Sequence, residues 1–151
     1  MDQQSFLNII DKTPLVSVDL IIENPAGEVL LGKRLNRPAQ GFWFVPGGRI
    51  RKNETIADAI RRVSSVELGM ELSLQNSILL GAFDHIYTDN FAGVEGINTH
   101  YVALGHKFIL PHMPDIKTDQ QHDEMHWIKI DALLNDDQVH PNTKLYFMRD
   151  K

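Results

Sequence analysis

One stretch of the sequence brings together residue types that can hold a divalent cation and bind phosphate groups. Five residues separate Gly48 from Glu54, seven more separate Glu54 from Arg62, and Glu67 follows Arg62 in the same segment. Glutamate oxygens are ligands for hard cations, and arginine side chains offset the charge of phosphate groups. Because the pattern fixes several residue types over the 23 positions from Gly48 to Met70, it is far more specific than an isolated glycine motif.

The residues after position 54 predict a helix that carries Arg62 and Glu67. Residues 46–48 are expected to break the preceding strand and expose backbone. Thr55 can then cap the helix start, and Gly69 supplies the left-handed residue that ends it. Apolar positions step by three and four along the helix. The expected core face consists of Ile56, Ala59, Ile60, Val63 and Val66.

Strands are predicted on both sides of this helix. A period of two over residues 15–22 indicates a half-buried strand with Asp19 on its polar face. Turn-forming residues 24–27 lead into an apolar run over residues 29–35, so the two segments predict a hairpin. Further strands are expected over residues 42–45, 78–87, 100–110 and 125–130, a loop over residues 36–41, and short helices over residues 131–134 and 143–149.

This order of elements predicts an α/β protein in the broad sense, of the α+β type. Strands lie before and after one central helix with little strict alternation, which favours a mixed β-sheet with helices packed on its faces. The length of 151 residues predicts a single domain over residues 1–151.

The composition excludes several classes of function. Lysine and arginine number 15 against 20 aspartates and glutamates, and the resulting net charge of −5 argues against a nucleic-acid partner. The absence of cysteine excludes a disulfide framework, a thiolate metal site and a catalytic thiol. No export signal is visible, and no apolar run approaches the roughly 20 residues that span a bilayer. We therefore expect a soluble cytoplasmic protein without a membrane partner.

The spacing described above resembles the signature of the Nudix hydrolases. That resemblance implies the Nudix fold, a mixed β-sheet sandwiched between helices. Val63 and Val66 stand where the family normally places two metal-binding glutamates, and Ser64 stands where it places a hydrophobic residue. The positions that agree with the signature are Gly48, Glu54, Arg62, Glu67, Gly69 and Met70.

The sequence resembles one subfamily, the GDP-mannose mannosyl hydrolases, in which the same two glutamates are missing. The resemblance covers nearly the whole chain. In that subfamily water displaces GDP at the anomeric carbon of the sugar with inversion, so phosphorus is not attacked. The similar stretches are TPLVSVDLIIEN, LLGKRLNRPAQGFWFVPGGRI and segments within residues 84–91, 99–101 and 119–127.

The resemblance implies a Mg²⁺ site, with Mn²⁺ as a substitute. The backbone carbonyl of Gly47, the carboxylate of Glu67 and the side-chain amide of Gln121 match the ligands of the subfamily. A single protein charge suits a Mg²⁺ ion that is also bound by the diphosphate of the substrate.

The resemblance also assigns roles in catalysis and substrate binding. His122 matches the general base, and Arg49 and Arg62 match residues that offset charge on the departing GDP. The chemistry agrees, because displacement at an acetal carbon needs a stabilised leaving group and a base for water, and histidine has an unperturbed pKa near 6.5. The remaining contacts implied around the sugar and diphosphate are Arg34, Asp19, His85 and Tyr101.

Each assignment has a plainer alternative. Glu67 could be a surface charge at the helix end, and Arg62 could form an ion pair along the helix. Glu54 could orient Arg62 or take part in function. His122 could be a solvated loop residue, and Asp19 a buried polar residue that is satisfied by hydrogen bonds.

Three functions therefore stand side by side. The first is Mg²⁺-dependent hydrolysis of GDP-mannose, with GDP-glucose as a further substrate, by an enzyme that the resemblance implies is a homodimer. The second is a pyrophosphatase that cleaves nucleotide sugars at phosphorus. The third is a nucleotide-binding module without turnover. The combination of metal ligands, arginines and a histidine favours an enzyme.

Overall fold

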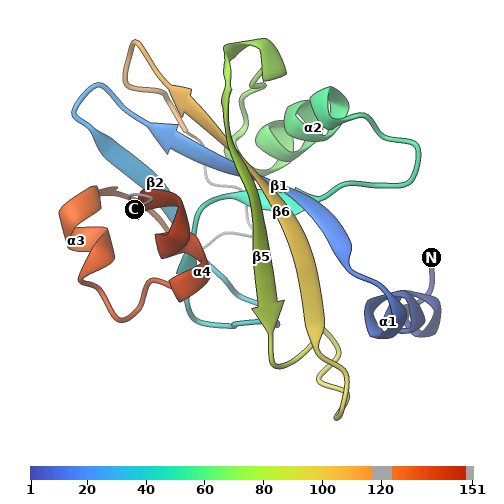
Figure 1. The fold of residues 1–151 in the computed structure, drawn as a ribbon. Helices are drawn as coiled ribbons and strands as arrows, with labels where there is room; N and C mark the ends of the chain where they lie inside the picture. Colours follow the sequence, from blue (N-terminus) through green and yellow to red (C-terminus); the bar gives the residue numbers. More distant parts are fainter. Residues whose placement is uncertain (117–123, 149–151) are drawn as a thin grey trace.

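The computed structural model describes residues 1–116 and 124–148, in which a β-sheet is flanked by helices (Figure 1). None of the helices among these residues is long and apolar enough to cross a membrane. In chain order the elements are α1 (Gln3–Lys12), β1 (Leu15–Glu23), β2 (Glu28–Lys33), β3 (Trp43–Phe44), β4 (Gly47–Arg49), α2 (Ile56–Leu68), the 3₁₀ turn η1 (Leu74–Asn76), β5 (Ile78–Tyr87), β6 (Thr99–Ile109), β7 (Met125–Lys129), α3 (Ile130–Leu134), α4 (Pro141–Lys144) and the 3₁₀ turn η2 (Leu145–Phe147).

The sheet is mixed, as the order of elements predicts. Its strands follow the order β3-β2-β1-β6-β5, with β4 paired to β1 and β7 paired to β2. The pairing of β1 with β6 is parallel, and the other pairings are antiparallel. The predicted hairpin of β1 and β2 is confirmed, and β5 pairs antiparallel with β6.

Strand β1 is buried on both faces, so the expectation of a half-buried strand is wrong. Val18, Leu20 and Ile22 share one core cluster with residues of α2, whereas Val16 at the start of the strand is exposed. Ile21 lies on the opposite face, in a second core cluster with Leu133 of α3 and Tyr146 of η2. Because β1 is a central strand with helices on both sides (Figure 1), its polar alternation is limited to the part where Ser17 and Asp19 face the candidate site.

The segment after Pro46 is a strand and not the expected break. Gly47–Arg49 forms β4 and pairs antiparallel with β1, which places Gly47 beside Asp19 and Arg49 beside Ser17. Both glycines are needed at close approaches. A Cβ atom on Gly47 would lie 2.3 Å from Oδ1 of Asp19, and one on Gly48 would lie 2.9 Å from Cγ2 of Val63.

Helix α2 begins and ends as its sequence predicts. The hydroxyl of Thr55 accepts a hydrogen bond from the amide of Asp58 at 3.1 Å, and Gly69 takes the left-handed conformation with φ of 69°. The predicted core face is partly wrong, because Ile56 and Val66 are exposed. The face that packs on the sheet is rotated by about one position and consists of Ala59, Ile60, Val63, Ser64 and Leu68.

Ser64 belongs to this buried face because its hydroxyl is satisfied by backbone groups. It donates to the carbonyl of Ile60 at 2.7 Å and accepts from the amide of Leu72 at 2.9 Å. A hydroxyl can therefore replace the hydrophobic residue of the Nudix signature, since it ties the segment after the helix back onto α2.

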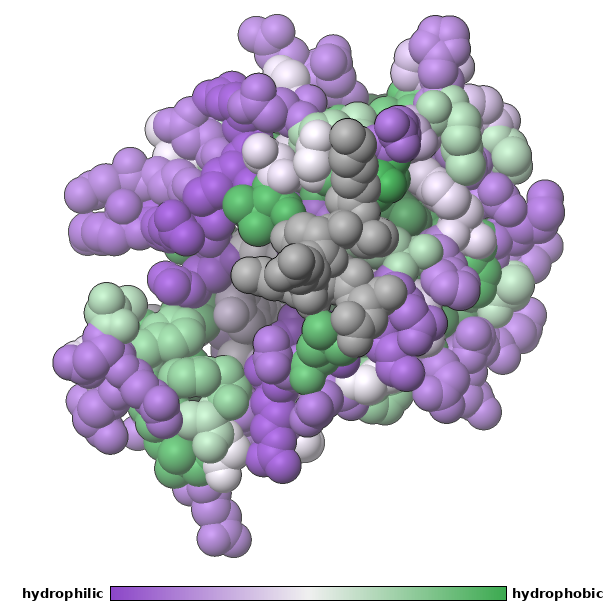
Figure 2. Space-filling model, turned by 180° about the vertical axis from the view of Figure 1, so that it is seen from behind, coloured by the Kyte–Doolittle hydropathy of each residue, from purple (hydrophilic) through white to green (hydrophobic). Residues whose placement is uncertain are grey.

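Two terminal elements differ from the sequence-based expectation. Helix α1 was not predicted, although Asp2 caps it by accepting from the amide of Ser5 at 2.7 Å. This helix projects from the molecule at the lower right of Figure 1. In the reversed view of Figure 2 the corresponding corner, at the lower left, shows hydrophobic residues beside hydrophilic ones. The helix expected over residues 143–149 instead begins at Pro141 and continues after Lys144 as a 3₁₀ turn.

Candidate functional site

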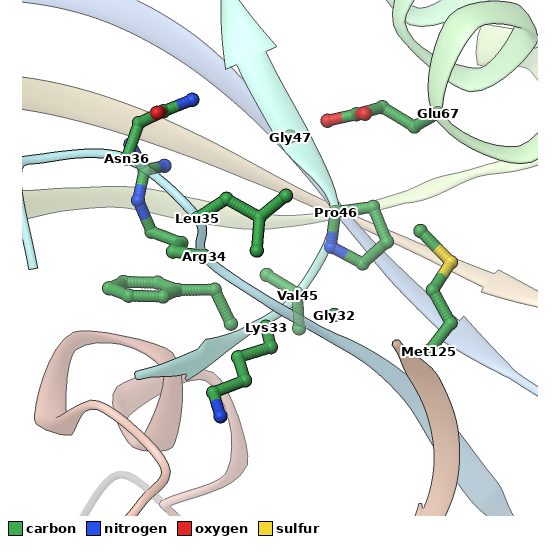
Figure 3. Close-up of a pocket in the computed structure, with 11 residues that line it drawn as sticks. Gly32, Lys33, Arg34, Leu35, Asn36, Val45, Pro46, Gly47, Glu67 and Met125 are labelled. Atoms are coloured by element: carbon green, nitrogen blue, oxygen red, sulfur yellow. The ribbon is translucent and has the colours of Figure 1, made fainter. Parts of the chain in front are cut away.

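Two adjoining pockets lie where β1, β2 and β4 meet. They share the lining residues Arg34, Phe44, Val45 and Gly47, so they form one continuous site region. The first pocket also contains Glu67 of α2 (Figure 3). The second contains Asp19, Arg49, His85 and Tyr101. The structure thus brings together five residues predicted around the substrate and two predicted at the metal, from segments far apart in sequence.

Asp19 is one of the residues that line the second pocket. Its Oδ2 atom accepts a hydrogen bond of 2.6 Å from the hydroxyl of Tyr146. Burial raises the pKa of Asp19 to about 6, although the Tyr146 hydrogen bond and the charge of Arg34 act in the opposite direction. At neutral pH the side chain is therefore mainly a carboxylate, but one that is close to protonation.

His85 is buried next to Asp19 and is neutral at physiological pH. Burial is the main cause that lowers its pKa to about 4, and the charge of His140 acts in the same direction. Its Nδ1 atom lies 3.8 Å from Oδ2 of Asp19. This distance is too long for a hydrogen bond, and a neutral ring forms no ion pair. Its Nε2 atom is buried and has no hydrogen-bond partner among the described residues. His85 lines the second pocket, but its Nε2 atom is closed off from solvent in this structure.

Two arginines and a tyrosine line the same region. The guanidinium of Arg34 lies 5.5 Å from the ring centre of Phe44, and its buried Nε atom has no hydrogen-bond partner within residues 1–116 and 124–148. The guanidinium of Arg49 lies 4.6 Å from the ring centre of Phe6 in α1. Burial raises the pKa of Tyr101, so its hydroxyl stays protonated and can donate a hydrogen bond. These groups suit a ligand that carries both negative charge and hydroxyl groups.

Arg62 lies behind the site, where it is paired with Glu54. Its Nε and Nη2 atoms donate to the two carboxylate oxygens of Glu54 at 2.7 and 2.9 Å, and Nη2 also donates to the carbonyl of Arg49 at 2.8 Å. The hydrogen bond from Arg62 is the main cause that lowers the pKa of Glu54 to about 2. Arg62 is not among the residues that line either pocket. In this geometry it connects α2 to β4 and supports Arg49.

The first pocket contains the groups predicted to hold a metal ion. Figure 3 shows the side chain of Glu67 pointing from α2 toward Gly47. A carboxylate and a backbone carbonyl are both hard oxygen donors of the kind that Mg²⁺ prefers, so the residues fit this ion. The predicted ligand Gln121 and the predicted base His122 lie outside the described residues.

The valines that replace two glutamates of the signature have different environments. Val63 is buried against Gly48, whereas Val66 is about half exposed on the surface of α2. Among residues 1–116 and 124–148 no group of three or more histidines, cysteines or acidic residues could hold a metal ion. This part of the chain therefore offers Glu67 without the additional carboxylates of a larger acidic cluster.

Sequence reasoning missed the contributions of both chain ends to the site. Tyr146 reaches Asp19 from η2, and Phe6 contacts Arg49 from α1. The ring of Phe6 also lies 5.2 Å from that of Phe91. The N-cap at Asp2 is a local signal for α1, but no local signal relates Tyr146 to a residue 127 positions earlier.

Comparison with known proteins identifies similar sequences. A profile of the NUDIX domain matches residues 13–149. The low-salt glycan biosynthesis protein Agl8 of Haloferax volcanii is 44% identical over 118 residues, which cover 78% of this chain and 72% of that protein. The ADP-ribose pyrophosphatase of Methanocaldococcus jannaschii is 37% identical over 70 residues, which cover 46% of this chain and 40% of that protein.

Comparison of structures identifies the same architecture. The MutT NUDIX hydrolase of Burkholderia pseudomallei has a TM-score of 0.73 at 26% identity, covering 89% of this chain and 96% of that chain. The MutT protein of Methanosarcina mazei has a TM-score of 0.72 at 20% identity, covering 90% of this chain and 92% of that chain. These similarities confirm the expected mixed sheet between helices.

Proposed function

This chain belongs to the NUDIX domain family of hydrolases, and we propose that it hydrolyses GDP-mannose to GDP and free mannose, with GDP-glucose as a further substrate. In the proposed reaction, water attacks the anomeric carbon with inversion and the bond from that carbon to the diphosphate oxygen breaks. The protein is proposed to act in the cytoplasm as a homodimer.

One observation carries this proposal. Asp19, Arg49, His85 and Tyr101 converge on one pocket, while Val63 and Val66 leave α2 without two carboxylates that attack at phosphorus normally uses. The pocket offers hydrogen-bonding groups for a sugar and cations for a diphosphate. The similarity to a glycan biosynthesis protein supports a substrate that contains a sugar.

The residues have distinct proposed roles. Arg34 and Arg49 offset the negative charge that develops on the departing GDP, and Arg62 supports Arg49 through its carbonyl. His85 binds the substrate as a neutral ring. His122, from outside the described residues, accepts the proton of the attacking water.

Glu67, the carbonyl of Gly47 and the amide of Gln121 are proposed to hold Mg²⁺, with Mn²⁺ as a substitute. When bound, the ion supplies positive charge to the diphosphate of the leaving group. The carboxylate of Glu67 provides the charged oxygen ligand, and the other two groups provide neutral oxygen ligands.

The identity of the products tests the proposal. The purified protein should be incubated with Mg²⁺ and a panel of nucleotide sugars, and the products separated by chromatography. Carbon attack releases GDP and free hexose, whereas a pyrophosphatase that cleaves a GDP-sugar releases GMP and hexose phosphate. The similarity to an ADP-ribose pyrophosphatase makes this second outcome the alternative to test. Binding without any product supports the third function, a nucleotide-binding module.

A further inference from the structure

The turn η2 places one tyrosine in contact with residues that line the site. Tyr146 is only 9% exposed, and its hydroxyl donates to Oδ2 of Asp19 at 2.6 Å. Its ring makes edge contacts with the rings of Phe83 and His85 at centroid distances of 4.7 and 5.6 Å. The tyrosine therefore contacts two residues of the site region and is fixed by packing on β5.

The sheet leaves space for this ring at a glycine of β6, the strand directly beside β1. Gly105 of β6 pairs directly with Asp19 of β1. A Cβ atom on Gly105 would lie 2.5 Å from Cε1 of Tyr146, so any larger residue there would displace the ring. The absence of a side chain beside Asp19 is thus what allows Tyr146 to reach it.

The two oxygens of Asp19 face different surroundings. Oδ2 is bonded to Tyr146, whereas Oδ1 lies on the side of Gly47, so close that a Cβ atom there would be 2.3 Å away. Gly47 lines both pockets, and Asp19 lines the second. The carboxyl group is consequently held between the backbone of β4 and the tyrosine hydroxyl.

We propose that Tyr146 is a positioning residue that fixes the Asp19 carboxylate for its contact with the bound nucleotide sugar. The inference rests on the proposed function in one respect, namely that Asp19 contacts the ligand. Tyr146 itself acts through Asp19. Tyr146 is therefore part of the binding machinery as well as of the core, and it is the residue of η2 that contacts Asp19.

The hydroxyl group is the feature that matters for this role. It is a donor that satisfies Oδ2 and restricts rotation of the carboxyl group. Without it, a buried carboxylate oxygen would face aromatic rings, which is unfavourable for a charged acceptor. Phenylalanine at position 146 would keep the packing on Phe83 and remove only this hydrogen bond.

A double-mutant cycle tests the proposal. A hydrogen bond to a charged group contributes about 1.5 to 3 kcal/mol, so Tyr146→Phe should lower kcat/KM for the nucleotide sugar by about 10-fold to 100-fold. In an Asp19→Asn background the same substitution should change kcat/KM by less than about 3-fold, because its target has already been altered. Equal losses in the two backgrounds, or no loss in the wild-type background, would overturn the proposal.

Phe147→Leu is the matched control, because it alters packing in the same turn and keeps the tyrosine hydroxyl. It should leave kcat/KM within about 3-fold of the wild-type value. A loss as large as that of Tyr146→Phe would indicate a purely structural role for η2 and would contradict positioning by the hydroxyl.

A measurement without substrate separates this inference from the proposed function. The Asp19 ¹³Cγ resonance at pH 8 should shift in Tyr146→Phe and stay in place in Phe147→Leu. If the wild-type protein hydrolyses no nucleotide sugar, the proposed function fails. The Asp19 resonance then still tests whether the Tyr146 hydroxyl positions the carboxylate. An unchanged resonance in Tyr146→Phe would show that the hydroxyl does not position Asp19.

Discussion

Glu67 links the geometry of the first pocket to the proposed chemistry. It approaches Gly47 from α2, while the neighbouring signature positions hold Val63 in the core and Val66 on the surface. A site with one carboxylate suits an ion whose remaining charge balance comes from a diphosphate ligand. The loss of this single charge should therefore have a large effect.

Glu67→Gln should lower kcat by about 100-fold or more and raise the Mg²⁺ concentration needed for half-maximal activity. Glutamine keeps the size and hydrogen-bonding capacity of the side chain but removes its charge. Steady-state rates measured across a Mg²⁺ titration check this expectation. An unchanged rate with unchanged Mg²⁺ dependence would locate the metal at other residues.

His122→Gln should lower kcat by about 10² to 10⁴-fold and flatten the acid limb of the pH profile. A general base must be neutral, so the rate should fall as pH decreases through its pKa, which is near 6.5 for an unperturbed histidine. His85 is the control, because its pKa of about 4 keeps it neutral through this limb. His85→Gln should weaken substrate binding and retain the limb.

Asp19 is the second group to compare in the same experiment, since burial raises its pKa to about 6. Rates of Asp19→Asn and His122→Gln should be followed from pH 5 to pH 8. If the acid limb persists in His122→Gln and disappears in Asp19→Asn, the assignment of the base to His122 is wrong.

At the scale of elements, the site depends on how α2 is joined to its neighbours. Arg62 connects the helix to β4 through Glu54 and the carbonyl of Arg49. Ser64 connects it to the following segment through the amide of Leu72. The first connection orients the strand that carries Gly47 and Arg49, and the second fixes the end of the helix that carries Glu67.

Glu54→Gln should lower the free energy of unfolding by about 1 to 3 kcal/mol at pH 7 and remove a pH dependence of stability. The hydrogen bond from Arg62 lowers the pKa of Glu54 in the folded protein to about 2, well below its ordinary value of 4.5. The stabilisation is therefore present above about pH 4.5 and is lost as pH falls toward 2. Urea denaturation of the wild type and Glu54→Gln at pH 7, 4 and 2.5 checks this expectation. A free energy of unfolding that changes with pH in the same way in both proteins would contradict it.

Ser64→Ala should lower the free energy of unfolding by about 1 to 3 kcal/mol, because it leaves the amide of Leu72 without its partner. Ser65→Ala, one residue along and exposed, is the matched control and should be close to neutral. Thermal denaturation of the two variants makes the comparison. Equal melting temperatures would show that the Ser64 hydroxyl does not stabilise the helix end.

For the whole molecule, the sequence predicts correctly those features that depend on residues close together in the chain. It does not predict features that depend on tertiary packing. Thr55 and Gly69 mark the ends of α2 because capping involves residues only a few positions apart. The alternation in β1 was misleading, since helices cover both faces of a central strand. The role of η2 could not be predicted, because Tyr146 and Asp19 are brought together only by the complete sheet.

The candidate site followed a similar division. The resemblance placed Gly47 and Glu67 together at the metal and named Asp19, Arg34 and other residues that line the adjoining pocket. Spacing could not show that Arg62 is occupied by Glu54 behind the pocket. The roles of residues 121–122 stay predictions, since those residues lie outside the described part of the chain.

The central claim is that water attacks carbon and not phosphorus, and hydrolysis in ¹⁸O-labelled water tests it directly. Mass spectrometry of the products of GDP-mannose hydrolysis should find the label in free mannose and none in GDP. Label in GMP, in mannose phosphate or in the terminal phosphate of GDP would contradict the account, because it would mean that phosphorus had been attacked.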